Sequence, residues 1–182
     1  MSSILIVPVG SVAGLDLPSL CDRLREIFHF PASVRTGAPI DPQPAFDNFR
    51  NQFNSSVLLM SLLERHGAHG GKVVGITAHD LFVPVLTYVF GEAQLDGAAA
   101  IVSAHRLQEE FYGMPPDRAL EHGRLLKETV HELGHTFGLV HCREPECVMR
   151  SSTAVEEIDL KGDRFCENCW RKLGELSGGR PG

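Results

Sequence analysis

The segment HELGHTFGLVHC, residues 131–142, holds three histidines, one glutamate, two glycines and a cysteine within twelve positions. His131 and His135 are four residues apart, so on a helix both imidazoles stand on one face and can reach one metal ion. Zinc accepts such nitrogen ligands, and a catalytic zinc site combines three protein ligands with one open position for water. The spacing of His131 and His135 is therefore compatible with a metal site, and solvated histidines on an amphipathic helix are the alternative until the rest of the motif is considered.

The third ligand must come from chain that has left the helix, because the next helical turn would crowd the open position. Gly138 permits a sharp turn, since glycine adopts positive φ easily, and His141 follows three residues later. Glu132 is carried toward the open position, where its carboxylate can take a proton from metal-bound water and pass it to a leaving amine. The pattern HExxHxxGxxH thus predicts amide hydrolysis, although three imidazoles also accept cobalt, nickel or iron.

Four cysteines form a second group of candidate metal ligands, and the first of them lies in the same segment as the histidines. Cys142 follows His141 directly, and Cys147, Cys166 and Cys169 complete two pairs of cysteines. Four thiolates make the usual closed tetrahedral zinc site, which takes no substrate. We expect a structural zinc here that braces the loop delivering His141, with two disulfides, four free thiols or a redox-active CxxC as alternatives.

Composition limits the partners and the compartment. The net charge is −6, with 17 basic and 23 acidic residues, so neither nucleic acid nor an anionic membrane is expected as a partner. A zinc finger that binds nucleic acid is also disfavoured, because the chain around Cys166 carries few positive charges. No apolar run approaches the ~20 residues of a membrane span. The start of the chain does not resemble a secretion signal, and clustered cysteines without one indicate a cytoplasmic protein.

The length of 182 residues predicts a single α/β domain, residues 1–182. Strands are expected at residues 4–9, 72–77, 85–90 and 98–104, and helices after Asp16, before Gly67 and after Asp117. The order of strand, helix, loop, helix and strand favours a mixed, mainly parallel sheet with helices packed on it. Apolar and polar side chains alternate more in residues 85–90 than in the neighbouring segments, so these residues are expected to form an antiparallel edge strand. A peptide can pair with such a strand as an additional strand.

The last of these helices must carry the two histidines. Its apolar residues fall at helical spacing on one stripe, which comprises Leu126, Val130, Leu133 and Phe137. At 100° per residue, His131 and His135 point more than 90° away from that stripe. The helix therefore packs on the core through one face and presents the histidines on another.

With these residues in hand, the chain resembles the archaemetzincins, a branch of the metzincin zinc peptidases. That family's signature joins HExxHxxGxxH to Cys-x4-Cys-x-Met and then to CxxC. The matching residues, in order, are His131, Glu132, His135, Gly138, His141, Cys142, Cys147, Met149, Cys166 and Cys169. The one departure is a stretch between Met149 and Cys166 that is one residue shorter than the family pattern. The signature spans about 40 residues of the chain and is very specific.

The resemblance implies a two-lobed metzincin-like zinc peptidase domain. An upper lobe, residues 1–138, would hold the sheet, a backing helix and the active-site helix. A small C-terminal lower lobe, residues 139–182, would hold His141, Met149, the structural zinc and a helix. Met149 would form a turn that supports the histidines from below, and a peptide would lie in the cleft antiparallel to residues 87–90. Some metzincins carry a tyrosine after this methionine, but Arg150 stands here, so the oxyanion donor is unassigned.

These observations favour a zinc-dependent metallopeptidase, either an endo- or an aminopeptidase, that hydrolyses peptide bonds with Glu132 as general base. We expect two Zn²⁺ ions per chain, one catalytic and one structural, a monomer, and peptide or protein substrates. The alternative is a metal-containing peptide-binding or regulatory module with little or no turnover. The intact Glu132 argues against it, because a protein without turnover has no need of the base.

Overall fold

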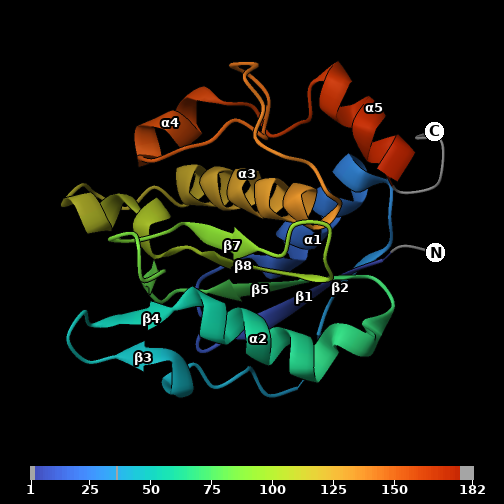
Figure 1. Cartoon of the computed structure of the whole chain (residues 1–182). Coiled ribbons are helices and arrows are strands. Elements are labelled where there is room, and N and C mark those ends of the chain that lie inside the picture. The colour runs from blue at the N-terminus through green and yellow to red at the C-terminus, as the bar shows by residue number, and fades with distance from the viewer. Residues whose placement is uncertain (1–2, 36, 177–182) are drawn as a thin grey trace.

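A five-stranded sheet with the order β2-β1-β5-β8-β7 organises the computed structural model, which describes residues 3–35 and 37–176 (Figure 1). Its strands are β1 (Ile4–Val9), β2 (Ala32–Val34), β5 (Lys72–Thr77), β7 (Gly91–Ala93) and β8 (Ala99–Ser103). The first four strands of that order are parallel to one another, and only β7 is antiparallel, through its pairing with β8. This confirms the predicted mixed, mainly parallel sheet with an antiparallel edge strand.

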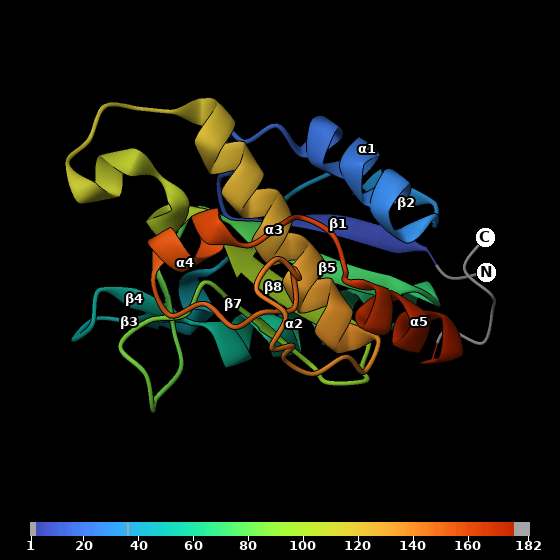
Figure 2. The ribbon, with the colours of Figure 1, turned by 90° about the horizontal axis from the view of Figure 1, so that it is seen from above.

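The described residues form five α-helices: α1 (Leu17–Phe28), α2 (Ser55–His66), α3 (Arg118–Thr136), α4 (Val155–Leu160) and α5 (Glu167–Leu176). α1 and α3 cover one face and α2 covers the other, while α4 and α5 lie on the far side of α3 (Figures 1 and 2). Asp16 and Asp117 cap α1 and α3, as expected, by accepting hydrogen bonds from Ser19 N and Leu120 N. None of the helices in the described part of the chain has the length and apolar composition to cross a bilayer.

The core has two parts because β1 alternates between the two faces of the sheet. Ile4 and Ile6 pack with α1 and α3, whereas Val7 and Val9 pack with α2. The predicted stripe of α3 is buried in the first part, with Leu126, Val130, Leu133 and Phe137 at most 5% exposed. The stripe thus fixes the rotation of α3 about its axis, which decides where His131 and His135 point.

Residues 85–90 do not form the predicted strand. The chain turns after Val83, where Leu86 N donates to Val83 O, and the Arg50 guanidinium holds the carbonyls of Leu86 and Pro84. Only an isolated bridge, Leu81 to Val89, remains of strand pairing there. The antiparallel edge strand begins directly afterwards, as β7.

A second, three-stranded sheet was not predicted. It consists of β3 (Phe46–Asp47), β4 (Gln52–Asn54) and β6 (Leu81–Phe82), in the order β3-β4-β6. The remaining elements are four 3-10 helices: η1 (Gln43–Ala45), η2 (Gly67–His69), η3 (His105–Leu107) and η4 (Glu109–Tyr112). Strands of two or three residues are too short to show an alternating pattern in a sequence.

Candidate metal centres and active site

The three predicted histidines converge at the C-terminal end of α3. The ring centroids of His131, His135 and His141 lie 4.7–5.3 Å apart, and one ring nitrogen of each falls within 4.8 Å of the others. Gly138 adopts a φ of +91°, which ends α3 and turns the chain back toward its own last turn. His141 therefore joins the two helical histidines in the way the spacing predicts.

The protonation of the two helical histidines follows from their partners. Nδ1 of His131 lies 2.8 Å from Val148 O, and Nδ1 of His135 lies 2.7 Å from Leu139 O. A carbonyl oxygen only accepts hydrogen bonds, so each Nδ1 carries the proton and each Nε2 has a free lone pair. Burial lowers the pKa of His131 to about 3 and also lowers the pKa of His135, so both rings are neutral at neutral pH.

The two free lone pairs face each other, because the Nε2 atoms of His131 and His135 are only 3.1 Å apart. Without a proton between them the two nitrogens repel, whereas a cation bound by both makes the same geometry favourable. Metal-ligating histidines commonly donate their other N–H to a carbonyl in this way, which fixes the tautomer and the ring orientation. The donor set, its spacing and its protonation therefore fit a divalent metal such as zinc.

Met149 packs against the helix that carries two of these histidines. Its side chain is fully buried, and a Cβ atom built on Gly134 would come within 2.4 Å of the Met149 sulfur. Gly134 stands between the two histidines of α3, so the absence of a side chain there lets the sulfur approach the helix backbone. The structure thus packs the Met149 sulfur against α3 at Gly134, and the supporting turn that the resemblance implies stays a prediction.

Glu132 points to the edge strand of the sheet. It is 7% exposed, and a Cβ atom built on Gly91 of β7 would lie 2.6 Å from Glu132 Cγ and 2.8 Å from Ile101 O. Burial, with the neighbouring carboxylate of Glu128 as the next cause, raises the pKa of Glu132 well above its usual value. The charge of a metal ion at the histidines would oppose this shift, and a carboxyl group with a pKa nearer neutrality exchanges protons more readily.

A buried ion pair lies one helical turn away from Glu132. Lys161 Nζ is 2.8 Å from Glu128 Oε1, and it donates to Arg150 O at 3.1 Å. Lys161 is 2% and Glu128 4% exposed. The lysine therefore offsets the charge of a carboxylate that would otherwise be isolated in the protein interior.

Replacing Lys161 by alanine is expected to lower the free energy of unfolding by about 3–5 kcal/mol, because Glu128 would be left buried without a counter-charge. The double variant Lys161→Met with Glu128→Leu should recover most of that loss. Denaturant unfolding of the metal-loaded protein measures both, with the exposed Lys172→Ala as control. A cost for Lys161→Ala no larger than that of the control would contradict the role assigned to the pair.

The four predicted cysteines form a separate group on the other side of the His141 loop. Their sulfur atoms lie within 4.8 Å of one another, and those of Cys142 and Cys166 are 3.8 Å apart. That separation is well beyond a disulfide bond, and all five cysteines of the chain are free thiols. Cys21, the fifth, is buried in the hydrophobic core. Four thiol ligands at this spacing fit a closed tetrahedral zinc site.

A short stretch of backbone connects the two groups. Val148 lies between Cys147 and Met149, its carbonyl accepts the hydrogen bond from His131 Nδ1, and its N–H donates to Arg164 O. Cys142, next to His141, donates its N–H to Met149 O at 2.9 Å. Whatever fixes the cysteines therefore also fixes the partner of one histidine and the position of another.

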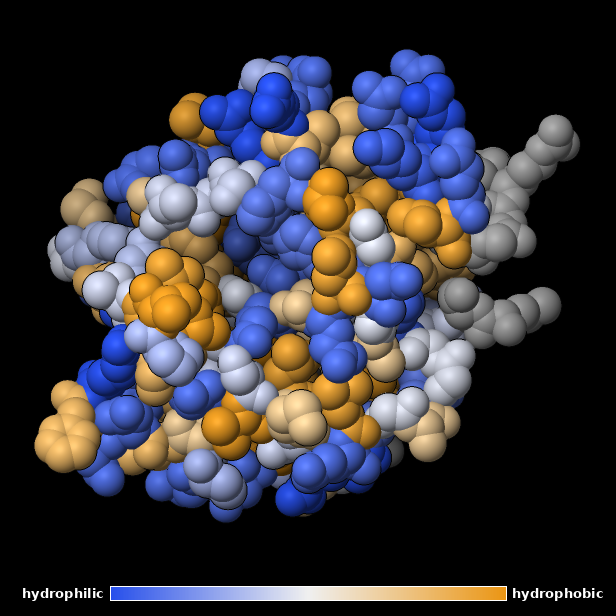
Figure 3. All heavy atoms as spheres, in the orientation of Figure 1, coloured by the Kyte–Doolittle hydropathy of each residue, from blue (hydrophilic) through white to orange (hydrophobic). Residues whose placement is uncertain are grey.

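A cavity of about 490 Å³ opens beside the histidines, and Figure 3 shows a hydrophilic recess between the two halves of the molecule. Residues 86–91 and Ala93 form one wall, residues 151–153 form another, and the remaining lining residues are Glu128, His131, Glu132, His135 and His141. The segment 87–90, expected to flank a substrate as a strand, thus lines the cavity as a loop. The cavity offers an extended chain a place beside Glu132 and the histidines.

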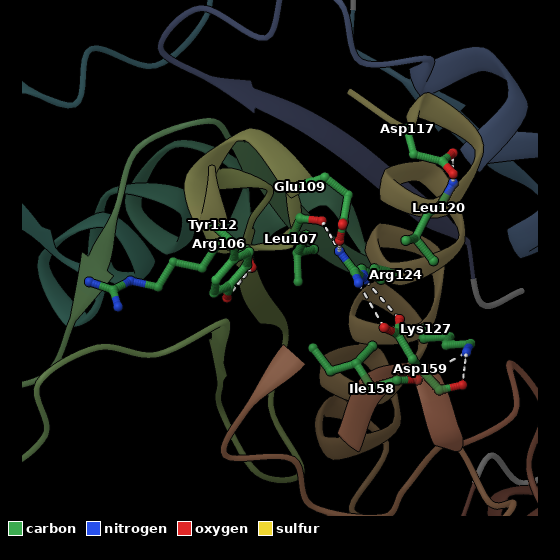
Figure 4. Close-up of polar contacts among 10 residues, drawn as sticks. All are labelled: Arg106, Leu107, Glu109, Tyr112, Asp117, Leu120, Arg124, Lys127, Ile158 and Asp159. Carbon is green, nitrogen blue, oxygen red and sulfur yellow. Dashed lines mark hydrogen bonds and ion pairs between the residues drawn. The ribbon is translucent and has the colours of Figure 1, made fainter. Parts of the chain in front are cut away.

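Helix α4 is fixed against α3 by the buried Arg124 and the half-buried Lys127 (Figure 4). The Arg124 guanidinium donates to both carboxylate oxygens of Asp159 at 2.7 Å and to Glu109 Oε1 at 2.6 Å, and Lys127 Nζ donates to Ile158 O at 2.9 Å. Arg124 is 4% exposed, whereas its carboxylate partners are partly open to solvent. These contacts hold in place the chain that follows the 151–153 wall.

The sequence patterns located every ligand candidate but not the residues around them. Among the described residues, only the three histidines and the four cysteines form groups that could hold a metal. The other histidines, His29, His66, His69, His79, His105 and His122, belong to neither group. Glu128 was missed, although its position four residues before Glu132 places it on the same face of α3. Gly91, Tyr88 and Lys161 reach the site from distant segments and carry no local signal.

Comparison with known proteins agrees with this geometry. The model of "Peptidase family M54" matches residues 46–175. The archaemetzincin of Pyrococcus furiosus is 39% identical over 96% of this chain and 94% of its own. The crystal structure of an archaemetzincin from Methanopyrus kandleri superposes with a TM-score of 0.82 at 33% identity, covering 97% of this chain and 96% of that one.

A zinc-dependent peptidase from Methanocorpusculum labreanum gives the same TM-score, 0.82, at 31% identity, and the match covers 94% of this chain and all of that one. Nearly the whole chain is therefore shared with these relatives, in sequence and in fold. The chain belongs to peptidase family M54, the archaemetzincins.

Proposed function

We propose that this protein is a zinc-dependent peptidase in which His131, His135 and His141 hold the catalytic metal and Glu132 is the general base. The observation that carries the proposal is the pair of facing Nε2 lone pairs, 3.1 Å apart, beside a buried carboxylate in a cavity. Membership of peptidase family M54 supports the same activity.

His131, His135 and His141 would hold the zinc, which would supply a Lewis acid that polarises the scissile carbonyl and lowers the pKa of water. Glu132 accepts a proton from the attacking water as the new carbon–oxygen bond forms. It then delivers that proton to the leaving nitrogen as the carbon–nitrogen bond breaks. The carbonyls of Val148 and Leu139 keep two imidazoles in the neutral, correctly oriented tautomer throughout.

The cysteines Cys142, Cys147, Cys166 and Cys169 hold a second, structural zinc in this proposal. Their free thiols and mutual distances support it, and Gly138 and Met149 act as supports for the histidine site. We further propose one domain, residues 1–182, divided at Gly138 into an upper lobe, 1–138, and a lower lobe, 139–182. The concentration of His141, Met149 and all four cysteines after Gly138 supports this division.

The substrate is a peptide or protein, as the family implies. A four-thiol zinc site persists where cysteines stay reduced, which supports a cytoplasmic location. The net charge of −6 supports a protein that does not use nucleic acid or an anionic membrane as its partner. A monomer is the proposed state in solution.

Metal analysis and hydrolysis test the proposal together. Protein purified under reducing conditions should contain two zinc ions per chain, matching the two ligand groups, and should cleave peptides from a mixed peptide library. A chelator that strips the histidine site should abolish cleavage, and added zinc should restore it. A protein that binds library peptides with two zinc ions in place but releases them uncut would instead be the regulatory module.

The edge strand should be intolerant of a side chain at Gly91. Alanine there would press on Glu132 Cγ and on Ile101 O, so the carboxylate must move, and a displacement of about 1 Å costs roughly 10²-fold in rate. We expect kcat/KM to fall by about that factor with the zinc content unchanged. Gly123→Ala on α3, where an added Cβ meets nothing within 4 Å, is the matched control. Equal rates for the two variants would show that Gly91 does not position Glu132.

A further inference from the structure

A phenol group connects the two walls of the cavity. Tyr88 lies in the 86–91 wall, and its Oη donates a hydrogen bond of 2.6 Å to the carbonyl oxygen of Thr153 in the opposite wall. Both residues line the same cavity as the three histidines and Glu132. The hydroxyl therefore belongs to a residue that lines the cavity proposed to hold a bound peptide.

The ring of Tyr88 is held in place from two sides. Phe90 meets it edge-on, with 5.4 Å between ring centroids, and the guanidinium carbon of Arg106 lies 4.0 Å from its centroid. Arg106 is itself fixed by two contacts of 2.7 Å with the Asp80 carboxylate. Packing thus fixes the ring. The hydroxyl has one hydrogen-bond acceptor, the carbonyl of the exposed Thr153, and another acceptor can take the place of that carbonyl.

Peptide hydrolysis is accelerated by a hydrogen-bond donor beside the scissile carbonyl. When water adds to the carbonyl carbon, the π-electron pair moves onto the oxygen, and a preorganised donor stabilises the resulting charge. Arg150, which follows Met149, is exposed and does not line the cavity. In the 151–153 wall, Thr153 Oγ1 donates to Glu157 Oε2, and Ser152 Oγ is buried.

We propose that Tyr88 is a catalytic residue whose hydroxyl exchanges Thr153 O for the oxyanion of the tetrahedral intermediate. The proton stays on the phenol, and only its acceptor changes. This inference rests on the proposed peptidase function, because it assigns a donor to that reaction.

The test is Tyr88→Phe, which removes the hydroxyl and keeps the ring between Phe90 and Arg106. Loss of one oxyanion donor costs about 10²–10³-fold in kcat, and KM should change little. A phosphinic peptide, which mimics the tetrahedral intermediate, should lose affinity by the same factor. A peptide hydroxamate, which binds the metal without such an oxyanion, should bind the variant as it binds the wild type.

The chain's other tyrosine provides a matched control. Tyr112 Oη also donates to a backbone carbonyl, that of Arg106, at 2.9 Å (Figure 4), but Tyr112 does not line the cavity. Tyr112→Phe should keep the wild-type kcat. Equal kcat values for the two variants would overturn the role of Tyr88. Hydrolysis that still depends on Glu132 would, in that case, continue to support the proposed peptidase function.

Two further outcomes also decide the matter. If Tyr88→Phe lowers the melting temperature and weakens both inhibitors equally, the hydroxyl only joins the cavity walls, and the catalytic role is wrong. If the wild-type protein with two zinc ions cleaves no peptide, the proposed function fails and the role of Tyr88 fails with it.

Discussion

Replacing Glu132 by glutamine is expected to lower kcat for peptide hydrolysis by about 10²–10⁴-fold, the usual contribution of a positioned general base. Glutamine has the same shape and can fill the same space against Gly91, but its amide cannot accept the proton of the attacking water. Glu132 belongs to neither metal-ligand group, so the zinc content should stay at two ions per chain. Steady-state kinetics on a cleaved peptide, with elemental analysis of the same sample, give both quantities.

The matched control is Glu121→Gln, also on α3. Glu121 is 4% exposed and pairs with Arg118 and Gln108, away from the cavity. Its replacement should leave kcat unchanged even if it costs some stability. A Glu132→Gln variant as active as this control would refute the assigned base, and loss of zinc from it would mean that the carboxylate supports the metal site instead.

Replacing Cys166 by serine is expected to disturb both metal sites. The variant should lose the zinc of the cysteine group, because three thiolates no longer close its tetrahedral shell. The histidine site should then weaken by about 10–100-fold, the usual cost of losing an outer partner of a metal ligand. The reason is Val148, whose carbonyl orients His131 and whose neighbour Cys147 belongs to the cysteine group.

Cobalt makes this coupling measurable without any activity assay. Cobalt bound to imidazoles or to thiolates differs in its visible spectrum, so competition with a chelator gives the affinity of each site separately. Cys21→Ala, which removes the one cysteine outside the group, should leave both affinities unchanged. An unaltered histidine-site affinity in Cys166→Ser would show that the two sites are independent.

The convergence of the candidate metal ligands was predictable because their geometry is mostly local. A helix fixes the relation of His131 to His135, and a glycine turn fixes that of His141, so spacing alone brings the three rings together. The strand predicted at 85–90 was wrong for the opposite reason. Its valines, threonine and tyrosine favour strands, but contacts from Arg50, distant in sequence, hold the segment as a loop, and context overrides β-propensity.

The surroundings of the site depend on pairs that only the folded chain creates. Gly91 against Glu132, Lys161 against Glu128 and Tyr88 against Thr153 each join segments more than thirty residues apart. No periodicity or motif records such pairs. The sequence therefore predicted what the site contains, and the fold was needed to see what orients its parts.

The position of Val148 bears on attempts to transplant this chemistry. A designer who copied residues 131–141 onto the helix of another scaffold would obtain the three imidazoles but not the carbonyl that orients His131. The carbonyl belongs to the turn between Cys147 and Met149, and the Met149 sulfur packs that turn against Gly134. A transplanted hydrolytic metal site would thus need α3 together with the whole segment that follows it, up to Cys169.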